Sequence, residues 1–262
     1  MRMKINKSKK IVKYFISIMF TFALSLTFSS YCISSNVYVN KNNIYNQETN
    51  NKSVSNENIY AKEKRIEYKD TTVEKNLNVN KFTSIDVCLP AIVSIKQGEF
   101  QQVIIKAKQD VIDKIKIRVS NGVLKIEFKK GIDNYRYINL EITVPTIQNI
   151  KIVSAAKVSM SSFKGLENLN ITLKGAGIFK ATENMTLMGT LHIMNSGVGL
   201  INCYKISTKK CKVILSGVGK CDVRSEFELE VEINGVGVVN YKGHPEKIYK
   251  DINGLGTLNN QN

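Results

Sequence analysis

The sequence predicts an all-β fold, a parallel β-solenoid of about six glycine-cornered coils preceded by a more irregular β region with hairpins. Three observations predict it. Glycine-containing segments recur about every 20 residues, apolar residues align at fixed distances from those glycines, and polar residues alternate with the apolar ones. A repeat of this length with strands and glycine corners is typical of one coil of a solenoid.

Six short segments establish the repeat, which occupies residues 146–262. Five of them are LKGAG, NSGVG, LSGVG, INGVG and INGLG, and a weaker copy, IVSAA, precedes them. One position of each segment serves as the reference: Ser154, Gly175, Gly197, Gly217, Gly235 and Gly254. Successive reference positions are 21, 22, 20, 18 and 19 residues apart, a regularity that chance does not readily give.

Apolar columns flank the reference positions. Four residues before them lie Ile150, Ile171, Ile193, Val213, Val231 and Lys250, and two before them lie Ile152, Leu173, Asn195, Leu215, Ile233 and Ile252. Four after them lie Val158, Phe179, Ile201, Cys221, Val239 and Leu258. Because successive side chains of a strand point to opposite faces, the alternation indicates strands. Asn195 interrupts its apolar column, so we expect a buried amide there unless a local bulge turns it outward.

Paired glycines mark each corner: Gly175, Gly177, Gly197, Gly199, Gly217, Gly219, Gly235, Gly237, Gly254 and Gly256. Glycine is expected at these structural positions because the chain turns sharply there or takes a positive φ. The residue between the two glycines is Ala, Val or Leu. We expect it to point inward at the corner.

Residues 66–145 are predicted to be β structure as well, but less regular. The segment 115–128 (IKIRVSNGVLKIEF) contains two alternating stretches around Asn-Gly, a strong hairpin signal. Residues 96–98 mark another turn, and residues 138–145 alternate into the first coil. We therefore expect one domain over residues 66–262, with an irregular β lead-in (66–145) and repeat coils (146–262).

The N-terminus predicts export. Residues 1–13 are basic, and residues 14–28 form an uncharged, mostly apolar run that suits a signal peptide better than a membrane span of about 20 residues. Residues 1–34 are therefore predicted to be a cleaved signal peptide or an uncleaved membrane anchor, with a lipoprotein acylated at Cys32 as a further alternative. Residues 35–65, rich in Asn, Ser, Lys and Glu, are predicted to be a flexible polar linker.

The net charge bears on the partner. The formal charge is +16, and removal of the six basic residues of the export segment leaves +10. This favours acidic partners such as anionic lipid or wall polymer, although a lysine-rich solvated surface has the same composition. We expect no nucleic acid, because the lysines are scattered among glutamates and no recognised nucleic-acid motif occurs.

The order of these motifs resembles a known bacterial family. The run KFTSIDVCLPAIVSIKQGEFQQVIIKA, then NGVLKIEF, then repeated SGVG and INGVG units resembles the putative auto-transporter adhesin head domain, called the GIN domain, over about residues 68–258. The resemblance implies a right-handed parallel β-helix on a bacterial surface, a role in adhesion and no catalytic residues. No barrel-forming strands of about ten residues follow the last glycine pair, so we expect export to depend on the N-terminal signal.

We predict no catalytic, metal-binding or cofactor-binding residue. His192 and His244 have no partner at ligand spacing, and no GxSxG, HExxH, CxxC or phosphate-loop motif occurs. A row of carboxylates is predicted on one strand face: Glu226, Glu228, Glu230 and Glu232. A solvated outer face beside lysines of neighbouring turns is the favoured interpretation, and the site of a polysaccharide-active enzyme is the alternative.

The cysteines are predicted to be structural. Cys203, Cys211 and Cys221 fall in inward columns, where a free thiol behaves as a small hydrophobe. A Cys203–Cys221 disulfide is the alternative, since the two lie on adjacent coils in neighbouring columns, although lateral stacking would favour residues of one column. Cys88 has no evident mate.

We expect an exported, non-enzymatic cell-surface scaffold whose outer faces bind a protein, a glycan or an anionic wall polymer. No cofactor is expected, and membrane contact is expected only through the N-terminal segment. Two other classes stay open: a polysaccharide-active β-helix enzyme, and an envelope component that self-assembles through the open edge of the last coil. The polar tail (259–262) would blunt that edge instead.

Overall fold

The computed structural model describes residues 72–129 and 138–262, which are almost entirely β structure. The predicted export segment (1–34), the predicted linker (35–65) and the first residues of the predicted domain lie outside the described residues. The one described helix, α2 (Gln109–Ile112), is a single turn. No helix in the described part of the chain is long and apolar enough to cross a membrane.

The described residues contain seventeen strands, which are joined in one network of strand pairing. The first nine are β1 (Thr72–Leu77), β2 (Ser84–Val87), β3 (Ile92–Gln97), β4 (Gln102–Lys108), β5 (Ile115–Ser120), β6 (Val123–Phe128), β7 (Asn139–Val144), β8 (Asn149–Ile152) and β9 (Lys157–Met160). The others are β10 (Leu169–Leu173), β11 (Ala176–Ala181), β12 (Met185–Asn195), β13 (Val198–Leu215), β14 (Val218–Ile233), β15 (Val236–Lys242), β16 (Lys247–Ile252) and β17 (Leu255–Asn260).

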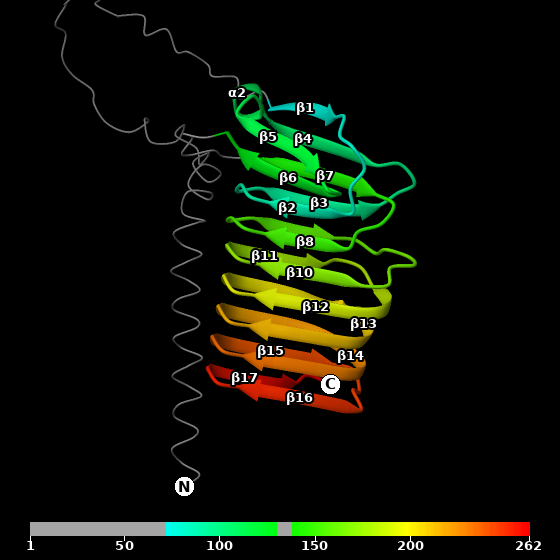
Figure 1. Ribbon diagram of the computed structural model, residues 1–262, viewed down its shortest axis with the longest axis vertical. Helices are drawn as coiled ribbons and strands as arrows, with labels where there is room; N and C mark the ends of the chain where they lie inside the picture. The colour runs from blue at the N-terminus through cyan, green and yellow to red at the C-terminus, as the bar shows by residue number, and fades with distance from the viewer. Residues whose placement is uncertain (1–71, 130–137) are drawn as a thin grey trace, which may run out of the picture.

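Each coil contributes one strand to each of two parallel sheets, and the coils stack along the long axis of the molecule (Figure 1). The first sheet contains, in stacking order, β6, β2, β8, β10, the end of β12, the later parts of β13 and β14, and β16. The second sheet contains β7, β3, β9, β11, the starts of β13 and β14, β15 and β17. The predicted parallel β-solenoid is therefore confirmed.

The solenoid has about five turns rather than the predicted six. Six reference positions enclose only five intervals along the chain. Between the first and the last of these corners the chain therefore completes five turns.

The predicted columns form the hydrophobic core. Ile171 lies between Ile150 and Ile193 of the adjacent coils, and all three are at most 1% exposed. Burial of such a side chain contributes about 1.5–3 kcal/mol relative to exposure. Asn195 lies between leucines of the adjacent coils and is fully buried, which confirms the expected buried amide.

The region predicted as an irregular lead-in contains a complete coil. β2 and β3 lie between β6–β7 and β8–β9, although they precede β6 in the chain. Val87, for example, pairs with Ile126 on one side and Ile152 on the other. Pro90 occupies the corner of this coil, so a repeat defined by glycines does not include it.

The predicted hairpin is present, and it belongs to a cap. β5 and β6 pair antiparallel around Asn121 (φ 51°) and Gly122 (φ 71°). The predicted turn after β3 leads to β4, but the two strands do not pair, because β7 lies between them. With α2, the antiparallel strands β1, β4 and β5 close the N-terminal end of the solenoid (Figure 1).

The expectation that the residue between paired glycines points inward is wrong. Leu255 is 62% exposed, and Val198, Val218 and Val236 are only half-buried, whereas the glycine that follows each of these valines is buried. Alternation continues through the corner: the residues two before, two after and four after the reference face the core. The residue one after the reference therefore faces solvent.

Candidate functional site

A polar cleft opens on the outside of the solenoid where strands β8 and β10 begin. It encloses about 350 Å³, within the range of small-ligand sites. Its lining comes from the strand starts and from the loop before β10: Thr146, Gln148, Asn149, Gly165, Leu166, Glu167, Asn168 and Asn170. Six of these eight side chains carry an amide, a hydroxyl or a carboxylate, so the cleft mainly offers hydrogen bonds.

A ladder of hydrogen bonds positions the asparagines of the strand starts. Nδ2 of Asn149 donates to Oγ of Ser84 at 2.8 Å, and Nδ2 of Asn170 donates to Oδ1 of Asn149 at 2.9 Å. The three residues occupy one outward column of the first sheet. Nδ2 of Asn170 also donates to the carbonyl oxygen of Gln148 at 3.5 Å, so both N–H groups of this amide have partners and its Oδ1 is the atom left for a ligand.

Asn168 is positioned from the loop. Its Oδ1 accepts a hydrogen bond from the backbone N–H of Thr190 at 2.8 Å, which leaves its Nδ2 as a donor. Gly189 allows this close contact, since a Cβ there would lie 2.5 Å from Oδ1 of Asn168. Gly165 turns the loop with a φ of 72°, a conformation that glycine adopts without strain. The cleft is thus held in shape before a ligand arrives.

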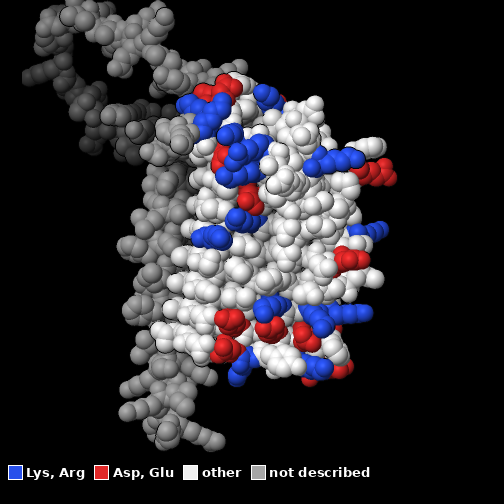
Figure 2. Space-filling view, viewed as in Figure 1, with Lys and Arg blue, Asp and Glu red and all other residues white. Residues whose placement is uncertain are grey.

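Charged side chains gather on the C-terminal part of the first sheet (Figure 2). Nζ of Lys212 lies 2.7 Å from the Glu230 carboxylate of the next coil, and Nζ of Lys210 lies 3.5 Å from that of Glu228. The hydrogen bond to Glu230 raises the pKa of Lys212. All four side chains are partly exposed, so these pairs contribute little to stability. The glutamates therefore belong to a solvated, ion-paired outer face.

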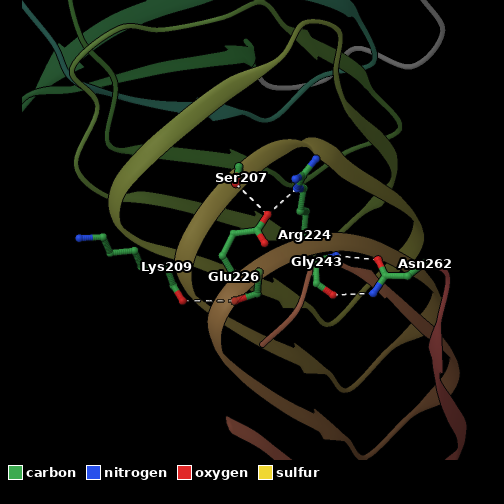
Figure 3. A network of polar contacts seen from close by, with 7 residues as sticks. Ser207, Lys209, Arg224, Glu226, Gly243 and Asn262 are labelled. Carbon is green, nitrogen blue, oxygen red and sulfur yellow. Dashed lines mark hydrogen bonds and ion pairs between the residues drawn. The ribbon is translucent and has the colours of Figure 1, made fainter. Parts of the chain in front are cut away.

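Glu226 does not continue this row, contrary to the prediction. The pairing between β13 and β14 shifts its register between Ser225 and Glu228, at a bend of the chain. Oε1 of Glu226 accepts hydrogen bonds from Nε of Arg224 at 2.6 Å and from Oγ of Ser207 at 3.1 Å (Figure 3). These bonds, the one from Arg224 foremost, lower the pKa of Glu226.

The polar tail pairs with the preceding coil. Asn262 binds both backbone groups of Gly243: its Oδ1 accepts from the N–H at 2.9 Å and its Nδ2 donates to the carbonyl at 2.6 Å (Figure 3). The backbone N–H of Gln261 donates to the carbonyl of Tyr241 at 2.9 Å. The tail thus continues the pairing of β17 with β15 beyond the last residue of each strand.

The two histidines lie far apart in the fold. His192 is half-buried on the outward face of the first sheet, between Asn170 and Lys212 in one column. Its Nε2 is buried without a hydrogen-bond partner among the described residues, and burial lowers its pKa. His244 is exposed after β15. Within residues 72–129 and 138–262, no group of three His, Cys, Asp or Glu side chains could hold a metal ion.

The inward cysteines are free thiols. Cys203, Cys211 and Cys221 are at most 2% exposed, and none of them is bridged. Burial raises the pKa of all three, that of Cys221 to about 12. The alternative of a Cys203–Cys221 disulfide is therefore not found. Cys88 is half-buried, also free, and its pKa is raised by burial.

The repeat glycines form ladders along the corner of the solenoid. One ladder is Gly177, Gly199, Gly219, Gly237 and Gly256, each beside the next in successive coils. The preceding glycines form the other: Gly175, Gly197, Gly217, Gly235 and Gly254. A Cβ at most of these positions would collide with a carbonyl oxygen of the coil before.

A positive φ does not explain the repeat glycines. The positive-φ glycines of the described residues are Gly122, Gly165, Gly219 and Gly243, and of these Gly219 alone, at 157°, belongs to the repeat. Close approach of stacked backbones is therefore the reason for glycine here.

No sequence motif marks the cleft, although the repeat spacing carries a signal for it. The intervals that end at Gly175 and Gly197 are 21 and 22 residues, against 18–20 for the later ones. The longer coils return through residues 161–168 and 182–190, which include the loop that lines the cleft. Extra residues in a repeat therefore mark the place where the regular surface becomes concave.

The fold and its repeat have counterparts among known proteins. A family described as putative auto-transporter adhesin, head GIN domain, matches residues 81–245. The chain is similar to a putative adhesin from Bacteroides fragilis NCTC 9343, with 19% identity, a TM-score of 0.56, and coverage of 73% of this chain and 97% of that one. No curated protein matches the chain.

Two further solved structures are similar over nearly their whole length. One is a putative lipid binding protein from Parabacteroides distasonis ATCC 8503, with 17% identity, a TM-score of 0.45, and coverage of 74% of this chain and 98% of that one. The other is a putative adhesin from Parabacteroides merdae ATCC 43184, with 16% identity, a TM-score of 0.41 and the same coverage.

Proposed function

Because the chain belongs to the putative auto-transporter adhesin head GIN domain family, we propose that it is a non-catalytic scaffold, exported by its N-terminal segment, that binds a partner through the outer faces of its solenoid. Family membership and the fold support a surface binding scaffold. They also indicate a surface or extracellular protein. Export by residues 1–34 and adhesion itself are the steps that the proposal adds.

One observation carries the proposal: an outward column of the first sheet is a continuous stripe of hydrogen-bonding side chains. In stacking order it begins at the buried Ser84 and continues through Asn149, Asn170, His192, Lys212, Glu230 and Tyr249. Parallel pairing over a close-packed core holds their backbones at a fixed spacing. A rigid array loses little conformational entropy on binding, and the cleft beside Asn149 and Asn170 gives the stripe a concave point.

The carboxylates support binding over glycan hydrolysis. Glycosidases place two carboxyl groups about 5–9.5 Å apart around the bond they cleave, and the acid has a raised pKa. Here the carboxylates of Glu228 and Glu230 face lysines, and Arg224 lowers the pKa of Glu226. Ion-paired carboxylates are poor proton donors.

Cell-surface display of the full chain tests the proposal. A non-adherent bacterial host that expresses the chain is measured for retention on immobilised matrix protein, wall polymer and neutral polysaccharide. We expect retention on at least one surface, and loss of retention in the Gly199→Ala, Gly219→Ala double variant, whose coils cannot stack. Absence of retention on all three, with the chain detected at the cell surface by antibody, contradicts the proposal. Release of reducing ends from the polysaccharide would favour the enzyme instead.

A further inference from the structure

The cleft at the start of β8 and β10 keeps hydrogen-bonding groups that the fold does not use. The Thr190 N–H occupies Oδ1 of Asn168, and the bonds to Asn149 and to the Gln148 carbonyl occupy Nδ2 of Asn170. The amide N–H groups of Asn168 and the amide oxygen of Asn170 therefore remain on two neighbouring asparagines. Glu167 adds carboxylate oxygens to the same lining.

This set of groups matches the chemistry of a saccharide. Each sugar hydroxyl is one donor and two acceptors, so vicinal hydroxyls are satisfied by an amide donor, an amide carbonyl and a carboxylate that lie together. Leu166, a buried residue of the lining, adds an apolar group for the C–H groups of a ring. The volume of about 350 Å³ is at the lower end of that of small-molecule sites, which suits a short saccharide.

The charge of the cleft selects a neutral ligand. Glu167 is the one ionisable side chain among the eight lining residues, so it would repel a uronic acid or a wall phosphate. The whole chain, in contrast, has a formal charge of +16 and attracts anions. A preference for neutral over acidic saccharides would therefore arise in the cleft and not from the general charge of the protein.

The geometry points to this cleft as a binding site for a neutral saccharide, with Nδ2 of Asn168 as donor and Oδ1 of Asn170 as acceptor. The inference rests on the proposed function as a surface binding scaffold and names the ligand class of its concave site. Because local hydrogen bonds already hold both amides, binding needs little rearrangement.

Saturation-transfer NMR of the full chain tests the inference. The chain is kept in lauryldimethylamine oxide, a detergent without a sugar headgroup, and is mixed in turn with maltose, lactose, N,N′-diacetylchitobiose and a glucuronic-acid disaccharide. We expect transfer to at least one neutral disaccharide, unchanged between low and high salt, and weaker transfer to the acidic one.

Two matched variants show whether the saccharide binds in the cleft. Asn168→Asp keeps the acceptor for the Thr190 N–H and replaces only the donor, so we expect roughly five- to tenfold weaker binding, as for one lost hydrogen bond. Asn253→Asp makes the same charge change at an exposed asparagine of a distant corner and should leave binding unchanged. Equal losses in the two variants, preference for the acidic disaccharide, or no transfer to any neutral one would overturn the inference.

The cell-display experiment described for the proposed function separates the two proposals when it is compared with the NMR result. A chain that is retained on surfaces but ignores the neutral disaccharides refutes the saccharide site and leaves the scaffold role. A chain that binds a disaccharide but is retained on no surface refutes the scaffold role and leaves the site.

Discussion

The carbonyl oxygen of Gly177 occupies the space in which a side chain at Gly199 would begin. The two glycines pair in adjacent coils, and a Cβ on Gly199 collides with that oxygen. The same contact recurs at Gly219 and Gly237, each against the glycine one coil earlier. Glycine thus allows the coils to stack to backbone contact at the corner, and the corner sets the register of both sheets.

We expect Gly199→Ala to destabilise the protein because the added methyl group must push two coils apart. The loss in free energy of unfolding should be at least about 1–3 kcal/mol, the range of overpacked sites, measured by guanidinium denaturation. Val198→Ala is the control, since Val198 faces outward and a surface change costs about 0.5 kcal/mol. Equal midpoints for the two variants would show that the corner contact is not limiting.

We expect Asn195→Leu to stabilise the protein by about 1 kcal/mol, because a buried polar group without a full set of partners costs free energy. Nδ2 of Asn195 has no hydrogen-bond partner among the described residues. Its Oδ1 accepts from Gly197, whose N–H also has the Leu173 carbonyl at 3.1 Å. Asn195→Ala should destabilise by leaving a cavity. A larger loss for Leu than for Ala in thermal unfolding would contradict this account.

The core columns could be predicted from the sequence because every coil buries the same positions. Ile171 and Phe179 lie at fixed distances from the glycine corner, and the register of the sheets matches those distances. The coil formed by β2 and β3 could not be found in this way. Its corner carries Leu89 and Ala91 at the two positions that are glycine in later coils, and β2 pairs with β8, whose residues lie 65 positions further along the chain.

The cleft was harder to predict than the fold because it depends on a loop. Asn168 belongs to no strand, and the bond that orients it comes from Thr190, which lies in β12 directly after a local shift of its register. A local departure from the column pattern also misplaced Glu226, since the bend before Glu228 shifts the strand register. The column pattern predicts the positions that every coil shares, and the cleft lies where one coil departs from that pattern.

We expect alkaline pH to destabilise the protein through its buried thiols. The pKa of Cys221 is about 12 in the folded chain against an ordinary value of 9.0, and burial raises the pKa of Cys203 and Cys211 as well. A group whose folded pKa is raised gives stability that is complete below its unfolded pKa. The stability that these thiols contribute should therefore be constant below about pH 9 and fall as the pH rises toward 12.

Denaturation midpoints between pH 8 and pH 11 check this slope. The Cys211→Ala, Cys221→Ala double variant should have a flatter alkaline slope than the parent, whatever its stability at pH 8. Val239→Ala removes a similar volume from the column of Cys221 without removing a titrating group, so its slope should match the parent. An unchanged slope in the double variant would assign the alkaline loss to other groups, such as Tyr204, whose pKa is also raised to about 12 by burial.

We expect Lys250→Ile to promote self-association. Lys250 of β16 continues the column of Val231, where the equivalent residues of earlier coils are at most 1% exposed. A lysine at this position disfavours the stacking of another sheet edge, because its charge would be buried. Isoleucine would extend the apolar stripe to the open end, so the mass measured by light scattering should rise with concentration more steeply than for the parent. Lys247→Ile, in an outward column of the same strand, is the control and should rise less. A parent chain that associates as strongly as Lys250→Ile would instead make the open end an assembly surface.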